Sequence, residues 1–325
     1  MKSLLAAAAI VLAASPAFSR DNIQIAGSST VLPYASIVAE AFGENFDWPT
    51  PVVESGGSSA GLKRFCEGVG TQTIDIANAS RPIKDSEREV CAQNGVTDIT
   101  EIMFGYDGIV FANSIEDDRF DFTPADIYLA INERSELKTW DQINPKFPNY
   151  QIKMFIPGTK HGTREVFEEK VLLEGCKAVG DYDKFVKELG DKKAAARQCM
   201  TVRKDGRSVD IDGDYTETLA NIGTNLNSFG VFGLSFYENN TDVIEVATID
   251  GVRPSQETVA SGEYPVSRPL FFYVKDIHAQ AIPGLWDYVR FFVSDDMAGS
   301  DGALADYGLV PDPELAKTQA KVENK

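Results

Sequence analysis

The sequence predicts an α/β fold of two lobes that face each other across a hinged central cleft. Strand-like apolar runs alternate with helical patterns along the chain, which is typical of a mainly parallel or mixed sheet flanked by helices. Three Ser-, Thr- and Gly-rich turns each stand between such a run and a helix, two near the start of the chain and one near its middle. Two facing lobes are a natural way to bring turns that are so far apart in sequence together.

Each turn follows a strand-like run and opens a helix. The turns are residues 26–31, 56–61 and 157–164, and the runs before them are 23–26, 52–53 and 152–156. Apolar spacing predicts a helix over 31–42, a second that ends near Gly68, and a third whose core side carries Val166, Phe167 and Val171.

The turns share the chemistry of an anion site. Free backbone N–H groups and the helix dipole favour negative charge at a helix start, and Ser and Thr hydroxyls add further donors. Ligands of open sheets bind beyond the carboxyl ends of strands, which is where these turns fall. Three such turns indicate a small oxyanion that is held by several helix N-termini.

Two further segments read as strands. Residues 75–79 predict a buried strand that ends before Ser80 and Arg81, a further candidate ligand-facing turn. Residues 102–112 predict an apolar strand region that is interrupted by a Gly-Tyr-Asp-Gly turn carrying Asp107.

The first 19 residues predict a secretory signal peptide, with Lys2, an apolar stretch at 4–14 and an Ala-Phe-Ser cleavage site before Arg20. The Ala-rich leader is typical of bacteria, so we expect a periplasmic protein. The whole chain has 31 Lys and Arg against 49 Asp and Glu, a formal charge of −18, and loss of Lys2 makes it −19. Such an acidic chain offers no basic patch for nucleic acid, so local dipoles and a few Arg side chains must hold any anion.

Four cysteines in an exported chain predict disulfides. They are Cys66, Cys91, Cys176 and Cys199, and three connectivities are open. The two close pairs would keep each bridge within one lobe, whereas crossed pairs would tie the lobes together and block a hinge. Because no C-x-x-C is present and the chain has only 2 His, the sequence predicts neither zinc nor a cofactor.

Two other patterns point to different chemistry. Ser59 is the middle of a G-x-S-x-G nucleophile elbow, and His278 beside Asp276 is the candidate base. A secreted serine hydrolase is therefore the alternative from a different class. Residues 210–214 partly match a calcium loop, but the Gly stands two positions early and the spaced Glu is missing, so we expect an acidic turn.

The motifs resemble a known family when they are taken in order. They are residues 27–33, 57–63, 75–82, 161–164 and 261–270. Together they resemble the periplasmic phosphate-binding protein of the high-affinity phosphate ABC transporter, over nearly all of the chain after residue 19. The resemblance implies a class II periplasmic-binding fold, phosphate in the cleft, a membrane ABC permease as partner and no enzymatic activity. We expect a monomer, and a receptor for another tetrahedral oxyanion is the nearest alternative.

The resemblance also implies a discontinuous first lobe and a set of ligand-binding residues. Residues 20–106 and about 265–325 would form lobe I, and about 107–264 would form lobe II. The ligand-binding residues that we expect are Ser29, Thr30, Val31, Ser58, Ser80, Arg81, Asp107, His161, Gly162, Thr163 and Arg164.

Two departures from the family affect this site. His161 replaces the usual Ser, so an imidazole N–H or the backbone amide must substitute for that hydroxyl. Some members place an Asp where Ser80 stands, as the acceptor for the proton that phosphate carries and sulfate lacks. We expect Asp107 to replace that acceptor because it lies near the predicted crossing between the lobes.

Overall fold

The structure is a computed structural model that describes residues 20–159, 162–212 and 215–325. The predicted signal peptide, residues 1–19, and His161 lie outside the described residues, so both remain predictions.

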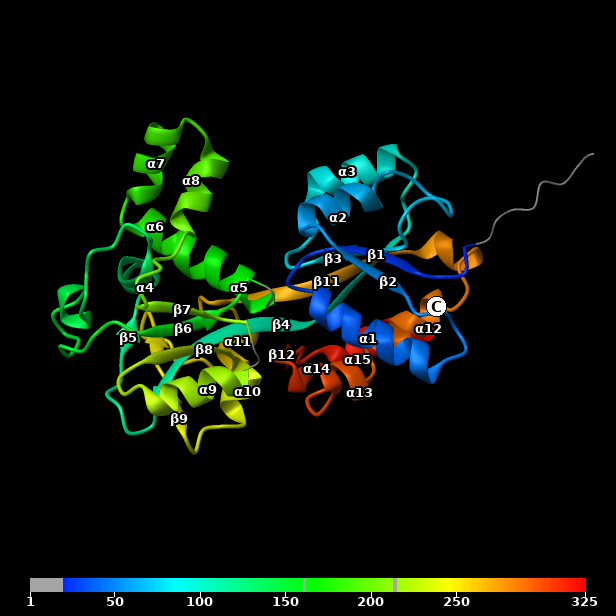
Figure 1. Ribbon diagram of the computed structural model, residues 1–325. Helices are drawn as coiled ribbons and strands as arrows, with labels where there is room; N and C mark the ends of the chain where they lie inside the picture. The colour runs from blue at the N-terminus through cyan, green and yellow to red at the C-terminus, as the bar shows by residue number, and fades with distance from the viewer. Residues whose placement is uncertain (1–19, 160–161, 213–214) are drawn as a thin grey trace, which may run out of the picture.

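Two lobes share one twisted sheet that runs through the whole molecule (Figure 1). Within the described residues the sheet has ten strands, with the order β2-β1-β3-β11-β4-β8-β6-β7, and β9 and β12 also pair with β4. Strands β1, β2 and β3 are parallel, as are β6, β7 and β8, whereas β4 and β11 run antiparallel to their neighbours. The strands are β1 (Gln24–Gly27), β2 (Val52–Ser55), β3 (Ile76–Ala79), β4 (Ile99–Ser114), β6 (Met154–Pro157), β7 (Ser208–Ile211), β8 (Phe229–Gly233), β9 (Ile244–Val246), β11 (Ser267–Lys275) and β12 (Leu309–Pro311); β5 (Asp121–Phe122) and β10 (Thr248–Ile249) form a separate pair. The mixed α/β class and the strands before the three turns are confirmed.

Strand β4 crosses from one lobe to the other without a break. Its first part pairs with β11 and its last part with β8. The turn predicted at 105–108 is wrong, because these residues lie within the continuous strand. Gly105 instead lets β12 approach β4 closely: a Cβ on Gly105 would lie 2.6 Å from the carbonyl oxygen of Val310. Asp107 consequently lies within a buried strand at the crossing between the lobes.

Hydrophobic side chains form separate cores in the two lobes. The cores of the first lobe use residues up to Phe104 and from Leu270 onward. The main core of the second lobe runs from Ile109 to Val266 and includes Val310. We propose that the lobe boundaries lie in these gaps, next to the predicted ones.

Helices cover both faces of the sheet in each lobe (Figure 1). The first lobe has α1 (Leu32–Asn45), α2 (Ser58–Phe65), α3 (Asp85–Gln93), α12 (Leu285–Phe292), α13 (Asp295–Ala298), α14 (Ala303–Asp306) and α15 (Leu315–Glu323). The second has α4 (Pro124–Ile131), α5 (Gly162–Val166), α6 (Glu174–Ala178), α7 (Asp181–Leu189), α8 (Lys192–Cys199), α9 (Tyr215–Thr224), α10 (Leu234–Glu238) and α11 (Gln256–Ala260). A π-helical segment, Phe167–Leu173, joins α5 to α6, and short 3₁₀ helices cover Trp140–Gln142 and Asp276–Gln280. No helix in the described ranges is long and apolar enough to cross a bilayer.

Each lobe carries one disulfide. Cys66 is bonded to Cys91 and Cys176 to Cys199, with sequence separations of 25 and 23 residues. The first bridge joins the end of α2 to α3, and the second joins α6 to α8. These are the local pairs favoured above, and neither bridge ties one lobe to the other.

Candidate functional site

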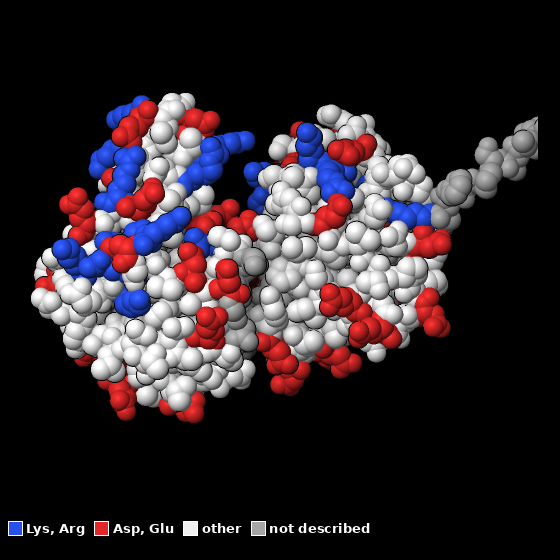
Figure 2. Space-filling model, in the orientation of Figure 1, with Lys and Arg blue, Asp and Glu red and all other residues white. Residues whose placement is uncertain are grey.

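A polar cavity of about 650 Å³ lies between the lobes. The space-filling view shows the molecule hollowed between the two lobes, with Lys and Arg side chains on both sides of the hollow (Figure 2). The cavity is lined by Gly56, Gly57, Ser58, Ser59, Ala60, Ser80, Arg81, Pro82, Glu165, Glu169, Lys170, Arg268 and Pro269. Its first-lobe wall is therefore formed at the carboxyl ends of β2 and β3 and the start of α2, where the sequence places a ligand.

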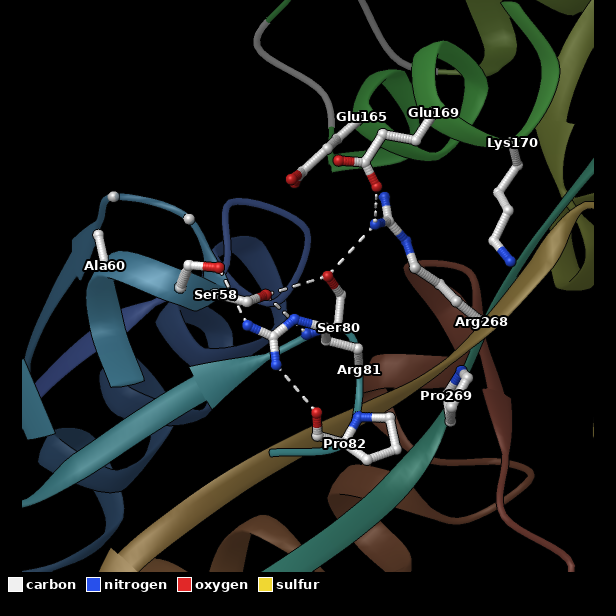
Figure 3. Close-up of a pocket in the computed structure, with 13 residues that line it drawn as sticks. Ser58, Ala60, Ser80, Arg81, Pro82, Glu165, Glu169, Lys170, Arg268 and Pro269 are labelled. Carbon is white, nitrogen blue, oxygen red and sulfur yellow. Dashed lines mark hydrogen bonds and ion pairs between the residues drawn. The ribbon is translucent and has the colours of Figure 1, made fainter. Parts of the chain in front are cut away.

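Two predicted serines meet in this wall. Ser58 is the first residue of α2, and its Oγ accepts a hydrogen bond of 3.1 Å from the backbone N–H of Ser80. The two Oγ atoms also lie 3.2 Å apart. This pair joins the second turn to the end of β3, and it places two hydroxyls side by side at the cavity (Figure 3).

Arg268 provides a buried positive charge in the same cavity, and it is not among the ligand-binding residues predicted from the sequence. It lies on β11 with 5% of its surface exposed, and its Nη1 donates to Ser80 Oγ at 3.2 Å and to Glu169 Oε2 at 3.0 Å. Figure 3 shows the guanidinium between Ser80 and Glu169. Its Nε and Nη2 have no hydrogen-bond partner in the described part of the chain. Because buried donors are normally satisfied, the N–H groups of these two nitrogens are available to an anion.

The first turn contacts the second lobe directly. Ser29 Oγ and Thr30 Oγ1 both donate to Glu165 Oε2, each at 2.8 Å. The Ser28 hydroxyl accepts from the backbone N–H groups of Thr30 and Val31 at 3.2 and 3.4 Å, so it holds the turn that precedes α1. The turn thus presents two side-chain hydroxyls to the other lobe, and the role of the Val31 amide as a ligand donor stays a prediction.

Both arginines that the sequence predicted as ligands are paired with carboxylates. Arg81 lines the cavity, but its Nη1 and Nη2 donate to Glu87 at 2.9 and 2.8 Å, and Nη2 also donates to Ser59 Oγ. Arg164 is buried and does not line the cavity; it binds Glu168, Asp210 and the carbonyl oxygen of Pro157. Binding of phosphate by these two residues therefore stays a prediction.

Asp107 is almost completely buried and is not among the residues that line the cavity. It pairs with Arg268 in the β4–β11 ladder, and neither carboxylate oxygen has a hydrogen-bond partner among the described residues. Burial raises the pKa of Asp107 to about 6, the nearby Arg268 opposes this rise, and Glu165 adds to it. An unpaired carboxylate of this kind can accept a proton-bearing donor.

The third turn enters α5 at Gly162, and Thr163 is buried there beside Tyr215. Thr163 does not line the cavity, and contact of either residue with a ligand stays a prediction.

In the part of the chain that the structure describes, the hydrolase elbow does not assemble a catalytic triad of Ser59 with His278. The Ser59 Oγ accepts from Arg81, whereas His278 is buried with both ring nitrogens in use. Its Nε2 accepts from the Gly70 N–H at 2.9 Å, which leaves Nδ1 to donate to Asp75 at 2.6 Å. A base with both nitrogens committed cannot activate a serine elsewhere. Within the described ranges, no three His, Cys, Asp or Glu side chains gather closely enough to hold a metal ion.

Comparison with known proteins agrees with this architecture. Residues 12–296 match the PBP superfamily domain. The protein SphX of Synechocystis sp. is 30% identical over 320 residues, which cover 96% of this chain and 84% of SphX. The phosphate-binding protein PstS of Staphylococcus saprophyticus is 27% identical over 303 residues, covering 92% and 83% of the two chains. A crystal structure of a possible phosphate binding protein from Planctomyces limnophilus matches with a TM-score of 0.72 and 22% identity, covering 93% of this chain and 98% of that one. The chain belongs to the PBP superfamily, and its two lobes form the periplasmic-binding-protein fold that the motifs predicted.

Proposed function

We propose that this protein captures inorganic phosphate in the cleft between its lobes and delivers it to a membrane ABC permease. The observation that carries the proposal is Arg268, a buried guanidinium whose Nε and Nη2 have no hydrogen-bond partner among the described residues, at a wall of serine hydroxyls. A relative over most of the chain is named a phosphate-binding protein, which supports phosphate as the anion. Family membership supports a binding protein rather than the serine hydrolase that Ser59 indicated.

The geometry provides donors from several elements to one small anion. Arg268 would supply charge-assisted hydrogen bonds, which are stronger than neutral ones. The hydroxyl pairs Ser58 and Ser80, and Ser29 and Thr30, would add donors from the first lobe. Hydrogen bonds of this kind gain strength where the cleft excludes water, so closure of the lobes around the anion would tighten binding.

We propose Asp107 as the acceptor for a proton of phosphate. The support is its position opposite Arg268 in the β4–β11 ladder, its burial, and two carboxylate oxygens that have no partner among the described residues. Sulfate lacks a proton at neutral pH, so it would face this carboxylate without a hydrogen bond. A site built to pair with a ligand hydroxyl rejects an analogue that lacks it.

The setting of this function is a proposal as well. The predicted signal peptide and one disulfide in each lobe support a periplasmic location, because disulfides persist in oxidising compartments. The local bridges leave the hinge free, which a receptor that closes on its ligand and then releases it requires. We propose that the receptor acts as a monomer and that the permease recognises its closed form.

Isothermal titration of the phosphate-stripped protein at pH 7 tests the proposal. We expect one phosphate per chain, bound tightly, and no heat from sulfate at the same concentration. Binding of sulfate, arsenate or molybdate in preference to phosphate would assign the cleft to another tetrahedral oxyanion. Absence of binding by all four would contradict an oxyanion receptor.

A further inference from the structure

A carboxylate of the second lobe already accepts hydrogen bonds from two of the hydroxyls that we propose as anion donors. The hydroxyls of Ser29 and Thr30 converge on a single oxygen of Glu165, Oε2, with both distances at 2.8 Å. Glu165 lies on α5, belongs to the second lobe and lines the cavity, whereas the two hydroxyls precede α1 in the first lobe. The contact therefore crosses the cleft at a position where an oxyanion would take the same donors.

The surroundings of Glu165 give its charge little compensation. Among the described residues, no Lys or Arg forms an ion pair with it. Glu169, four residues along the same helical segment, differs because it is paired with Arg268 at 3.0 Å and its side chain is 51% exposed. An anion that reaches the cleft would thus meet a neutralised, solvated carboxylate at Glu169 and an unneutralised one at Glu165.

The protonation of the anion decides whether it can share this space. Two fully ionised oxygens in contact repel each other, and the repulsion is strong where little water screens it. A proton between them converts the repulsion into a charge-assisted hydrogen bond. Inorganic phosphate carries at least one proton at neutral pH, whereas sulfate carries none.

We propose that Glu165 is a specificity-determining residue that accepts a hydrogen bond from a protonated oxyanion and repels one without a proton. The inference rests on the proposed phosphate-binding function. Glu165 would act from the second lobe, while Asp107 acts from the crossing strand. Two acceptors match the two protons of dihydrogen phosphate, so the cleft would exclude sulfate from both sides. Neither carboxylate takes a proton from the ligand, which keeps its protons throughout.

Glu165→Gln tests the proposal because it keeps the size of the side chain, removes the charge and adds an amide donor. Phosphate and sulfate would be titrated separately into the phosphate-stripped variant at pH 7, with sulfate at high enough concentration to measure weak binding. We expect the ratio of phosphate to sulfate affinity to fall by about tenfold or more, since a charged hydrogen bond is replaced by a neutral one for phosphate and a repulsion is removed for sulfate.

Two matched variants complete the experiment. Glu174→Gln removes the same charge from an exposed pair with Lys177 on α6, and we expect it to leave the ratio unchanged. Glu165→Asp keeps a carboxylate at the same position, and we expect it to preserve rejection of sulfate. Thermal unfolding of each variant confirms that it folds.

The outcomes separate the two levels of the proposal. A wild-type protein that binds phosphate, with an unchanged ratio in Glu165→Gln, overturns the role of Glu165 and leaves the receptor function intact. An equal gain of affinity for both anions also overturns it, because Glu165 would then only compete for Ser29 and Thr30. Failure of the wild type to bind phosphate overturns the proposed function itself.

Discussion

Two buried arginines on different parts of the molecule differ in how many guanidinium nitrogens have a hydrogen-bond partner among the described residues. Arg164, in the second lobe, is 7% exposed and bonded to Glu168, Asp210 and a backbone carbonyl. Arg268, on β11, is 5% exposed, and among the described residues it is bonded only to Ser80 and Glu169, through one nitrogen. The family resemblance indicated Arg164 as a phosphate ligand because it follows a family motif. The structure favours Arg268, because two of its nitrogens lack a partner among the described residues. An arginine whose donors are all used has none left for a ligand, whereas unused buried donors can bind one.

The largest expected effect comes from Arg268→Met, which removes the charge and keeps most of the side-chain volume. We expect the affinity for phosphate to fall by at least about a hundredfold, because hydrogen bonds to charged groups contribute about 1.5–3 kcal/mol each. Calorimetric titration measures the loss, with Arg290→Met on the exposed side of α12 as the control for net charge. An affinity within about threefold of wild type would contradict this role of Arg268 and would mean that another cation holds the phosphate.

The carboxylate that pairs with Arg268 in the sheet predicts a dependence of stability on pH. Burial raises the pKa of Asp107 from 3.8 to about 6, so the folded state holds a proton more firmly than the unfolded state. Its contribution to the free energy of unfolding is fully present below about pH 4 and is lost as the pH rises through about 6. We expect wild-type protein to lose up to about 3 kcal/mol more than Asp107→Asn over this window. Chemical denaturation curves at pH 4, 5, 6 and 7 measure the difference, and parallel curves would rule it out.

Asp107→Asn also sharpens the comparison at the ligand. We expect weaker phosphate binding and a ratio of phosphate to sulfate affinity that falls about tenfold, because an amide can donate to sulfate. In wild-type protein the same ratio should decline below about pH 6, where Asp107 becomes protonated and can donate. Unchanged affinity and selectivity in the variant at pH 7 would remove Asp107 from the binding site.

The smallest expected effect on affinity comes from Arg164→Met. We expect phosphate affinity to change less than about threefold and the free energy of unfolding to fall by about 1–2 kcal/mol, because its partners Glu168 and Asp210 are partly solvated. Thermal unfolding and titration of the same sample separate the two effects. A loss of binding as large as that of Arg268→Met would mean that phosphate draws Arg164 away from both carboxylates.

Local pattern predicted the strands and helices that surround the polar turns of the first lobe. A strand, a polar turn and a helix follow one another within a few residues at Ser29, Ser58 and Ser80, so hydrophobic periodicity and turn chemistry were sufficient. The local disulfides were favoured for the same reason, since both partners of each bridge lie close in sequence.

The residues that sequence reasoning missed depend on contacts between distant segments. Arg268 reaches Ser80 across 188 residues, and Glu165 reaches Ser29 across 136. The β4–β11 register that sets Arg268 opposite Asp107 is likewise invisible to local periodicity. One signal was available, because Arg268 stands inside a strand-like segment that resembles the family, where a buried charge needs a partner. The turn predicted at Gly105 was wrong for the same reason. A glycine is needed there because β12 packs closely against it, and β12 is distant in sequence.

A crystal structure of the protein grown with phosphate tests the central claim most directly. The account predicts a tetrahedral ion in the cleft, within hydrogen-bond distance of Arg268 Nε or Nη2 and of the first-lobe hydroxyls, with Arg164 still bound to Glu168 and Asp210. An ion held by Arg164 with Arg268 uninvolved, or a cleft that stays empty at saturating phosphate, would contradict it.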